Sequence, residues 1–172
     1  LVVGPRAEKA AAMMFMAEQQ FAADSFALAL NGDGNFAGFL DVIAKYGSTP
    51  AGNLAKHYAG ICYLKTGEYA QALEYLGKYS PETGSAPAAL LAAQNYGLQG
   101  DALVQTGKLP EAVKLYEKAA ATGKNTLTAP YYLKKSGEVY EKLGDNEKAL
   151  AAYKKIATDY ATSMEARDIQ KY

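Results

Sequence analysis

Apolar side chains recur along this chain at spacings of three and four residues, which is the pattern of amphipathic helices. Pro5 suits the entrance of the first such segment, and Asn31-Gly32 ends it. The pattern therefore predicts an all-α fold. The predicted helices lie at residues 6–30, 36–46, 51–66, 69–79, 86–106, 109–121, two across 131–160, and 164–172.

The two helices across residues 131–160 meet at Leu143-Gly144-Asp145. Gly144 suits the left-handed residue that ends a helix, and Asp145 or Asn146 can cap the next helix. Thr162 and Ser163 can cap the terminal helix in the same way.

A motif built on two glycines seven residues apart occurs three times. In each copy an alanine follows the second glycine by five residues, and a large apolar residue follows it by nine. We expect each copy to be a helical hairpin, with its small residues where the two helices cross and its large residues beside the crossing. The copies are Gly60, Gly67, Ala72 and Leu76; Gly100, Gly107, Ala112 and Tyr116; and Gly137, Gly144, Ala149 and Tyr153.

At these residues the chain resembles the tetratricopeptide-repeat family, whose pattern places Gly, Tyr, Gly, Ala and an aromatic residue in this order. Leu103 stands where the middle unit would have its usual tyrosine. The resemblance implies one domain over residues 1–172, an α-α superhelix of about four hairpins. Its parts are a degenerate hairpin at 1–50, repeats at 53–80, 93–121 and 130–160, and a C-terminal capping helix at 163–172.

The long first helix, the loose first unit and the similar segment ends at Tyr46 and Tyr160 also resemble the YfgM-like group of bacterial proteins. Members of that group carry one membrane span followed by repeats on the outer side of the inner membrane. The resemblance implies a periplasmic location, with an anchor upstream of Leu1, and a cytoplasmic location stays open. The sequence has no run of eighteen apolar residues, so we expect no span within residues 1–172.

In a tetratricopeptide array the first helices of the hairpins line the concave face, so the resemblance implies a set of groove residues that bind a partner. Gly97 and Asp101 stand where a carboxylate clamp would need Lys or Asn, which disfavours an adaptor for chaperone tails. A mixed groove remains, able to take a helix or an extended peptide. The groove candidates are His57, Ile61, Lys65, Gln94, Asp101, Gln105, Tyr131, Lys134, Glu138 and Lys142.

Composition narrows the chemistry further. Lysine and arginine together number 18, as do aspartate and glutamate, so there is no net charge to favour nucleic acid. The single histidine, His57, and the single cysteine, Cys62, lie five residues apart and point in different directions on a helix. A metal site would need further His or Cys ligands. The sequence therefore predicts no catalytic residue, no cofactor, no metal and no enzyme activity.

Residues 31–35, Asn-Gly-Asp-Gly-Asn, place oxygen donors at alternate positions, as a calcium loop does. If Asn31 is the first ligand, Phe36 takes the place of the required glycine and Val42 that of the closing glutamate. A start at Asp33 instead places Ala37 at a ligand position and Ala44 at the end. We expect a turn with a helix cap.

The sequence therefore favours a non-enzymatic scaffold that binds a peptide or protein partner, as the soluble part of an anchored envelope protein. The alternative is a homo-oligomeric structural subunit. Met13-Met14-Phe15-Met16 motivates that alternative, because no side of this segment is polar and one side needs a cover.

Overall fold

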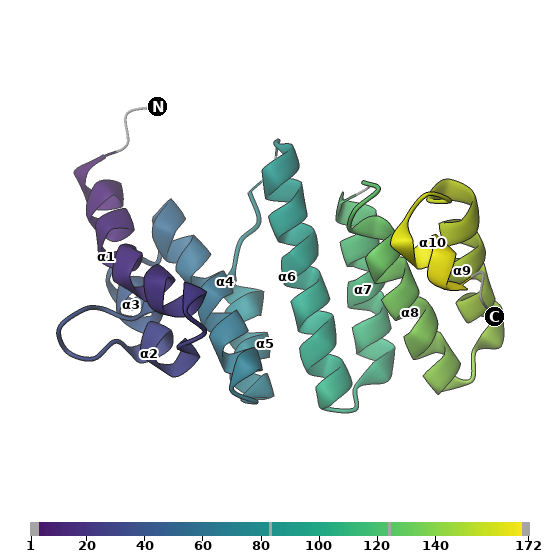
Figure 1. Cartoon of the computed structure of the whole chain (residues 1–172). Helices are drawn as coiled ribbons and strands as arrows, with labels where there is room; N and C mark the ends of the chain where they lie inside the picture. The colour runs from purple at the N-terminus through teal and green to yellow at the C-terminus, as the bar shows by residue number, and fades with distance from the viewer. Residues whose placement is uncertain (1–3, 83, 124, 170–172) are drawn as a thin grey trace. The chain divides into compact units, whose positions relative to one another are not determined.

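The computed structural model of the chain describes residues 4–82, 84–123 and 125–169. Within these ranges the backbone forms ten helices and no strand (Figure 1), which confirms the all-α prediction. The helices are α1 (Pro5–Ala22), α2 (Phe26–Asn31), α3 (Phe39–Tyr46), α4 (Pro50–Lys65), α5 (Tyr69–Lys78), α6 (Ala86–Gln105), α7 (Leu109–Gly123), α8 (Ala129–Leu143), α9 (Asn146–Asp159) and α10 (Met164–Ile169).

The helices divide between two compact units, Leu1–Ser80 with α1 to α5 and Pro81–Tyr172 with α6 to α10. The prediction of a single domain over residues 1–172 stays a prediction. Among the described helices, none is long and apolar enough to cross a bilayer.

In the first unit, α1, α2 and α3 pack against α4 around a cluster of aromatic rings. Phe39 is fully buried, and its ring stacks on Tyr58 with the centroids 5.2 Å apart. Phe21 meets both rings edge-on, at 6.1 Å from Phe39 and 4.9 Å from Tyr58. The buried residues of this core are Met14, Ala17, Ala29, Leu30, Phe39, Val42, Ala55, Ala59 and Cys62.

The predicted single helix over residues 6–30 is wrong, because the chain breaks between α1 and α2. Asp24 has a φ of 56°, a left-handed conformation that interrupts an α-helix. The break allows Ala29 to enter the same core as Ala17. In one continuous helix these two alanines would lie about 18 Å apart along the axis. The next helix, predicted from residue 36, begins at Phe39.

Residues 31–35 form a turn rather than a calcium loop. The Asp33 carboxylate accepts hydrogen bonds from the backbone N–H groups of Asn35, at 2.9 Å, and Phe36, at 3.2 Å. The N–H of Gly38 donates to Asp41 at 3.1 Å and so caps α3. These local bonds engage the carboxylates of Asp33 and Asp41 within the turn and the helix cap. Across the described residues, no group of three acidic, His or Cys side chains is placed to hold a metal ion.

Three hairpins follow, α4–α5, α6–α7 and α8–α9, and the predicted crossing glycines lie at their crossings. A side-chain carbon added to any of these glycines would collide with the large residue sixteen positions later, because the second helix lies directly over the glycine. The carbon would lie 2.5 Å from Leu76 at Gly60, 2.6 Å from Tyr116 at Gly100 and 2.5 Å from Tyr153 at Gly137.

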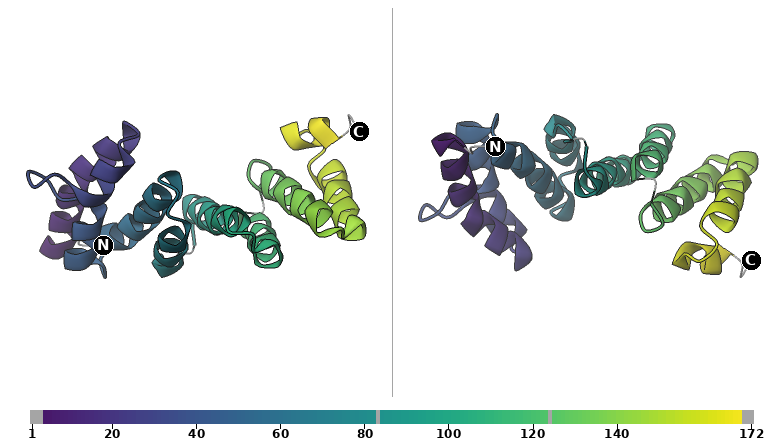
Figure 2. Two further views of the ribbon diagram at one scale, coloured as in Figure 1. Left: turned by 90° about the horizontal axis from the view of Figure 1, so that it is seen from below. Right: turned by 90° about the horizontal axis from the view of Figure 1, so that it is seen from above.

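The turns of the hairpins also follow the prediction. Gly67, Gly107 and Gly144 have φ values of 84°, 76° and 76°, which favour glycine at the end of a helix. Asp145 caps α9, accepting a hydrogen bond from the Lys148 N–H at 3.2 Å. The hairpin helices α8 and α9 lie side by side in both views of Figure 2.

The terminal helix α10 packs against α8 and α9 within the second unit. Ser163 caps it, with its hydroxyl oxygen 3.1 Å from the N–H of Ala166. Residues 170–172, which the predicted helix included, lie outside the described residues.

Candidate functional site

The groove candidates on α4 divide by burial. His57 is 1% exposed, and its ring lies 5.5 Å from that of Tyr79 and 6.0 Å from that of Tyr58. Ile61 is 8% exposed. We therefore correct the prediction for these two residues, since packed side chains offer little to a partner. Lys65 is exposed, with its ammonium group 6.0 Å from the Phe26 ring.

The remaining candidates lie on α6 and α8, on a surface that we call the α6–α8 face. Gly97 of α6 lies directly against the Tyr132 ring of α8, and a larger residue there would collide with it. At this contact α8 reaches α6 past α7, against which both helices pack. The predicted residues of the face are Gln94, Asp101, Gln105, Tyr131, Lys134, Glu138 and Lys142.

Asp101 is the centre of a polar cluster on this face. One of its carboxylate oxygens accepts hydrogen bonds from the Tyr116 hydroxyl and from the Lys135 ammonium group, each at 2.6 Å. The same Lys135 nitrogen lies 5.4 Å from the Tyr116 ring centre and 5.1 Å from that of Tyr131. Tyr131 in turn meets Tyr132 edge-on at 5.0 Å. The cluster therefore joins α6, α7 and α8.

The surroundings fix the protonation states in the cluster. Burial raises the pKa of Tyr116, and its hydrogen bond to the Asp101 carboxylate raises it further, so the phenol stays a donor. Burial disfavours the charged form of Lys135, but the hydrogen bond and the charge of Asp101 outweigh burial and its pKa is raised. Lys135 therefore stays a cation at neutral pH, and Asp101 already neutralises it.

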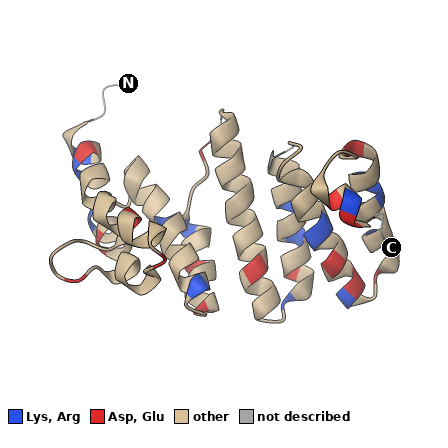
Figure 3. Cartoon of the chain, viewed as in Figure 1, with Lys and Arg blue, Asp and Glu red and all other residues tan. Residues whose placement is uncertain are grey.

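The other charges on the face lie nearer to solvent. Lys134 pairs with Asp168 of α10 at 3.0 Å, and the two side chains are 31% and 51% exposed. Glu138 and Lys142 are exposed and form no ion pair with a described residue. Figure 3 shows charged residues of both signs on α8 and α10, whereas Asp101 is the charged residue of α6. Tyr131, 43% exposed, is the large apolar side chain that the face presents.

Sequence reasoning missed three members of the cluster: Tyr116, Tyr132 and Lys135. Tyr116 was assigned to the hairpin crossing, which is correct for its ring but leaves out its hydroxyl. Lys135 directly follows Lys134, which is one of the groove positions that the repeat assigns to α8. The Lys134-Lys135 doublet was the available signal, although its partners Asp101 and Asp168 are far away in sequence.

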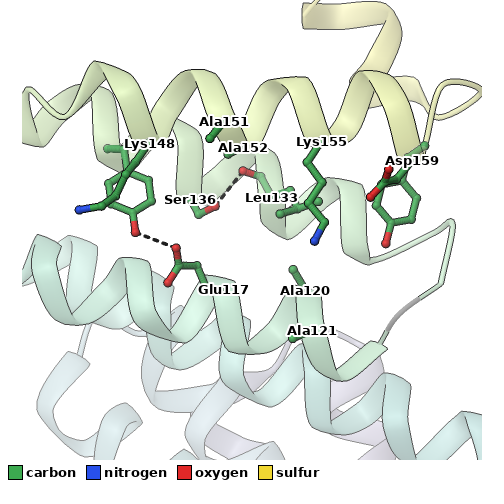
Figure 4. Close-up of a pocket in the computed structure, with 12 residues that line it drawn as sticks. Glu117, Ala120, Ala121, Leu133, Ser136, Lys148, Ala151, Ala152, Lys155 and Asp159 are labelled. Atoms are coloured by element: carbon green, nitrogen blue, oxygen red, sulfur yellow. Dashed lines mark hydrogen bonds between the residues drawn. The ribbon is translucent and has the colours of Figure 1, made fainter.

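A second surface feature, which we call the α7–α9 groove, lies between α7 and α9 over α8 (Figure 4). Its volume is about 570 Å³. No predicted groove residue lines it. Adjacent alanines in α7 and α9 were the signal available in the sequence. The lining residues are Glu117, Ala120, Ala121, Leu133, Ser136, Tyr140, Lys148, Ala151, Ala152, Lys155, Asp159 and Tyr160.

Comparison with known proteins agrees with the hairpin geometry. Family models of the tetratricopeptide repeat match residues 93–121 and residues 135–163. The first match has the boundaries that the sequence predicts, and the second overlaps the predicted repeat at 130–160. No curated protein matches the sequence.

Two solved structures of MamA have similar folds. One superposes with a TM-score of 0.67 over 88% of this chain and 73% of its own, at 20% sequence identity. The other has a TM-score of 0.52 over 70% of this chain and 67% of its own, at 22% identity. At such identities the likeness establishes the fold alone. The chain is therefore an all-α protein that contains tetratricopeptide repeats.

Proposed function

We propose that the chain is a non-enzymatic scaffold that binds a peptide or protein partner on the α6–α8 face. The observation that carries this proposal is the half-exposed Tyr131 ring of α8, held in place by its contacts with Tyr132 and Lys135 of the same helix. The repeat uses its glycines and alanines for packing, while Gln94, Gln105 and Tyr131 stay exposed to a partner.

The fixed ring suits the role of an anchor. Tyrosine supplies a large amphipathic contact, and a ring that is already ordered loses little entropy on binding. Gln94 and Gln105 are exposed amides on the same face, able to bond the backbone of an extended peptide. Because Asp101 and Asp168 neutralise Lys135 and Lys134, the face favours a neutral partner with an apolar or aromatic side chain.

Affinity capture with the whole chain as bait tests this proposal. Tyr131→Ala combined with Lys134→Glu removes the anchor and reverses one charge, so we expect the specifically captured proteins to fall about tenfold or more. Leu150→Ala is the control, because Leu150 is 53% exposed and lies on α9, away from the face. Capture of the same proteins in equal amounts by both variants would show that the face is not the binding site.

Self-association is the second candidate function, and α1 carries the observation for it. Phe15 is 55% exposed and Met16 is 39% exposed, whereas Met14 of the same helix points into the core and is buried. Adjacent large apolar side chains on a surface helix favour a contact with another protein surface. Light scattering of the purified chain tests this, with Phe15→Lys expected to yield monomers. A monomeric wild-type chain at high concentration contradicts the hypothesis.

We also propose that the chain works on the periplasmic side of a bacterial inner membrane, tethered by an upstream anchor. The support is the resemblance to the YfgM-like group. Protease treatment of spheroplasts tests it: the segment should be digested without lysis of the cells. Protection until lysis would place it in the cytoplasm.

A further inference from the structure

The floor of the α7–α9 groove is largely apolar, and its buried polar side-chain atoms already have hydrogen-bond partners. Ala120, Ser136 and Ala152 form it and are 7%, 1% and 9% exposed. The Ser136 hydroxyl donates to the backbone carbonyl of Leu133 at 2.9 Å (Figure 4), so its proton is already engaged within the helix. Among the described residues, no buried side-chain nitrogen or oxygen lacks a hydrogen bond. The floor thus offers methyl groups and little hydrogen bonding.

One end of the groove is closed by contacts between its own residues. The Tyr140 hydroxyl donates to Glu117 at 2.7 Å and so links α8 to α7. Lys148 pairs with Asp145 at 2.7 Å and lies 5.3 Å from the Tyr140 ring centre. The charges at this end are already engaged within the chain.

The other end carries charge that is not engaged in this way. Lys155 extends from α9 toward α7 across the groove (Figure 4), and it forms no ion pair with any described residue. Asp159, four residues later, accepts a hydrogen bond from its neighbour Thr158 at 3.0 Å. A lysine that precedes an acid by four residues is the less favourable order for a pair within a helix. Lys155 is therefore a cation at the edge of an apolar groove.

We propose that the α7–α9 groove binds an amphipathic helix of a partner protein, with apolar side chains on the alanine floor and a carboxylate against Lys155. A helix is favoured over a strand because it satisfies its own backbone hydrogen bonds, and the floor offers few partners to an extended backbone. The exposed alanines of the walls, Ala121 and Ala151, permit a helix axis to approach to about 8–10 Å.

The charge of the groove determines which helix fits. A carboxylate beside Lys155 forms a charge-assisted hydrogen bond at the boundary of an apolar surface, where the effective dielectric constant is lower than in water. If the partner helix carried a lysine instead of this carboxylate, the two positive charges would repel each other. This site lies on α7, α8 and α9, whereas the α6–α8 face uses other residues, so the two binding proposals can fail separately.

A pair of synthetic helical peptides, each about four turns long, tests the proposal on the whole chain. Both carry the same leucine-rich face, and they differ only in a Glu or a Lys at its edge. Fluorescence anisotropy gives the Kd of each. We expect the Glu peptide to bind the wild-type chain about tenfold more tightly than the Lys peptide, and Lys155→Glu to reverse that order.

One further variant and three controls separate the groove from the general surface of the chain. Ala151→Leu fills the groove and should weaken both peptides about tenfold. The controls Lys154→Glu and Ala157→Leu change exposed residues of α9 outside the lining, and Tyr131→Ala changes the α6–α8 face. All three should leave each Kd within about twofold.

Other results would overturn the proposal. These are failure of both peptides to bind the wild-type chain, an equal loss of binding with Lys154→Glu, or no change of preference with Lys155→Glu. Sedimentation of the chain alone tests for a second copy as the occupant. Oligomers that dissociate with both Ala151→Leu and Phe15→Lys would place α1 of another copy in the groove and exclude a separate partner.

Discussion

Helices α4 and α8 carry the same repeat positions, but different side chains reach the solvent. His57 and Lys134 each lie three residues before a crossing glycine, yet His57 is 1% exposed and the Lys134 side chain is 31% exposed. Aromatic rings cover His57, whereas the contact of Lys134 is an ion pair that stays partly in water. The repeat position therefore determines where the helices cross, and the neighbouring residues determine which positions remain open.

Substitution of a glycine at a hairpin crossing, a position that α4 and α8 share, has the largest expected effect on stability. Gly137→Leu places a large side chain where the Tyr153 ring already lies, so one of the two helices must move. We expect a loss of about 3 kcal/mol or more in the free energy of unfolding, measured by urea denaturation. Ala157→Leu, at an exposed position of the same hairpin, should change it by less than about 0.5 kcal/mol. Equal stabilities would mean that Gly137 is not at the crossing.

The difference in burial between His57 of α4 and Lys134 of α8 predicts the next largest effect on stability. His57→Ala removes a buried ring that contacts Tyr58 and Tyr79, and we expect it to cost about 2 kcal/mol. Lys134→Ala removes an exposed ion pair and should cost about 0.5 kcal/mol or less. Thermal and urea unfolding of both variants measure the contrast. A negligible cost for His57→Ala would return that residue to the set of groove candidates.

The hairpins were predictable because their signals are local: a small residue at a crossing, a glycine after a helix and a cap before the next. The break at Asp24 was not, since Ala23 and Asp24 are both acceptable in a helix, and the burial of Ala29 and Leu30 that the break permits depends on packing against other helices. Burial of His57 likewise depends on Tyr79, which follows the end of α5 and lies outside the repeat motif.

The α6–α8 face was predictable in outline for the same reason, because the repeat assigns Tyr131 and Asp101 to it. The cluster that orders Tyr131 was not predictable. Its bonds join residues fifteen and thirty-four positions apart, and no spacing rule links Lys135 to Asp101. The α7–α9 groove comes from small residues on separate helices, which appear in the sequence only as ordinary alanines.

The cluster predicts a pH dependence in the second unit. Tyr116 has a raised pKa in the folded chain, so folding favours the protonated phenol. That contribution is present below about pH 10, the ordinary tyrosine value, and is lost as the pH rises above it. Lys135, whose pKa is also raised, acts in the same direction. We expect unfolding on the alkaline side, followed by circular dichroism.

Tyr116→Phe isolates this contribution. The variant keeps the ring over Gly100 but removes the hydroxyl that donates to Asp101, so it should lose about 1 kcal/mol at neutral pH. Above pH 10 the difference between variant and wild type should shrink, because the tyrosine of the unfolded wild-type chain then ionises and stabilises the unfolded state, whereas the phenylalanine of the variant does not ionise. A constant difference across that range would show that the hydroxyl does not carry the pH dependence.

The smallest effect on stability belongs to Tyr131, and it is the sharpest test of why α8 differs from α4. A half-exposed ring contributes little packing, so Tyr131→Ala should change the free energy of unfolding by less than about 0.5 kcal/mol. If this ring is an anchor, the same change should weaken partner binding about tenfold or more, measured with a partner obtained by affinity capture. Tyr131→Ala would then lower binding without lowering stability, whereas a substitution of His57 would lower stability. A large loss of stability with Tyr131→Ala would make the ring a packing residue like His57 and remove the distinction between the two helices.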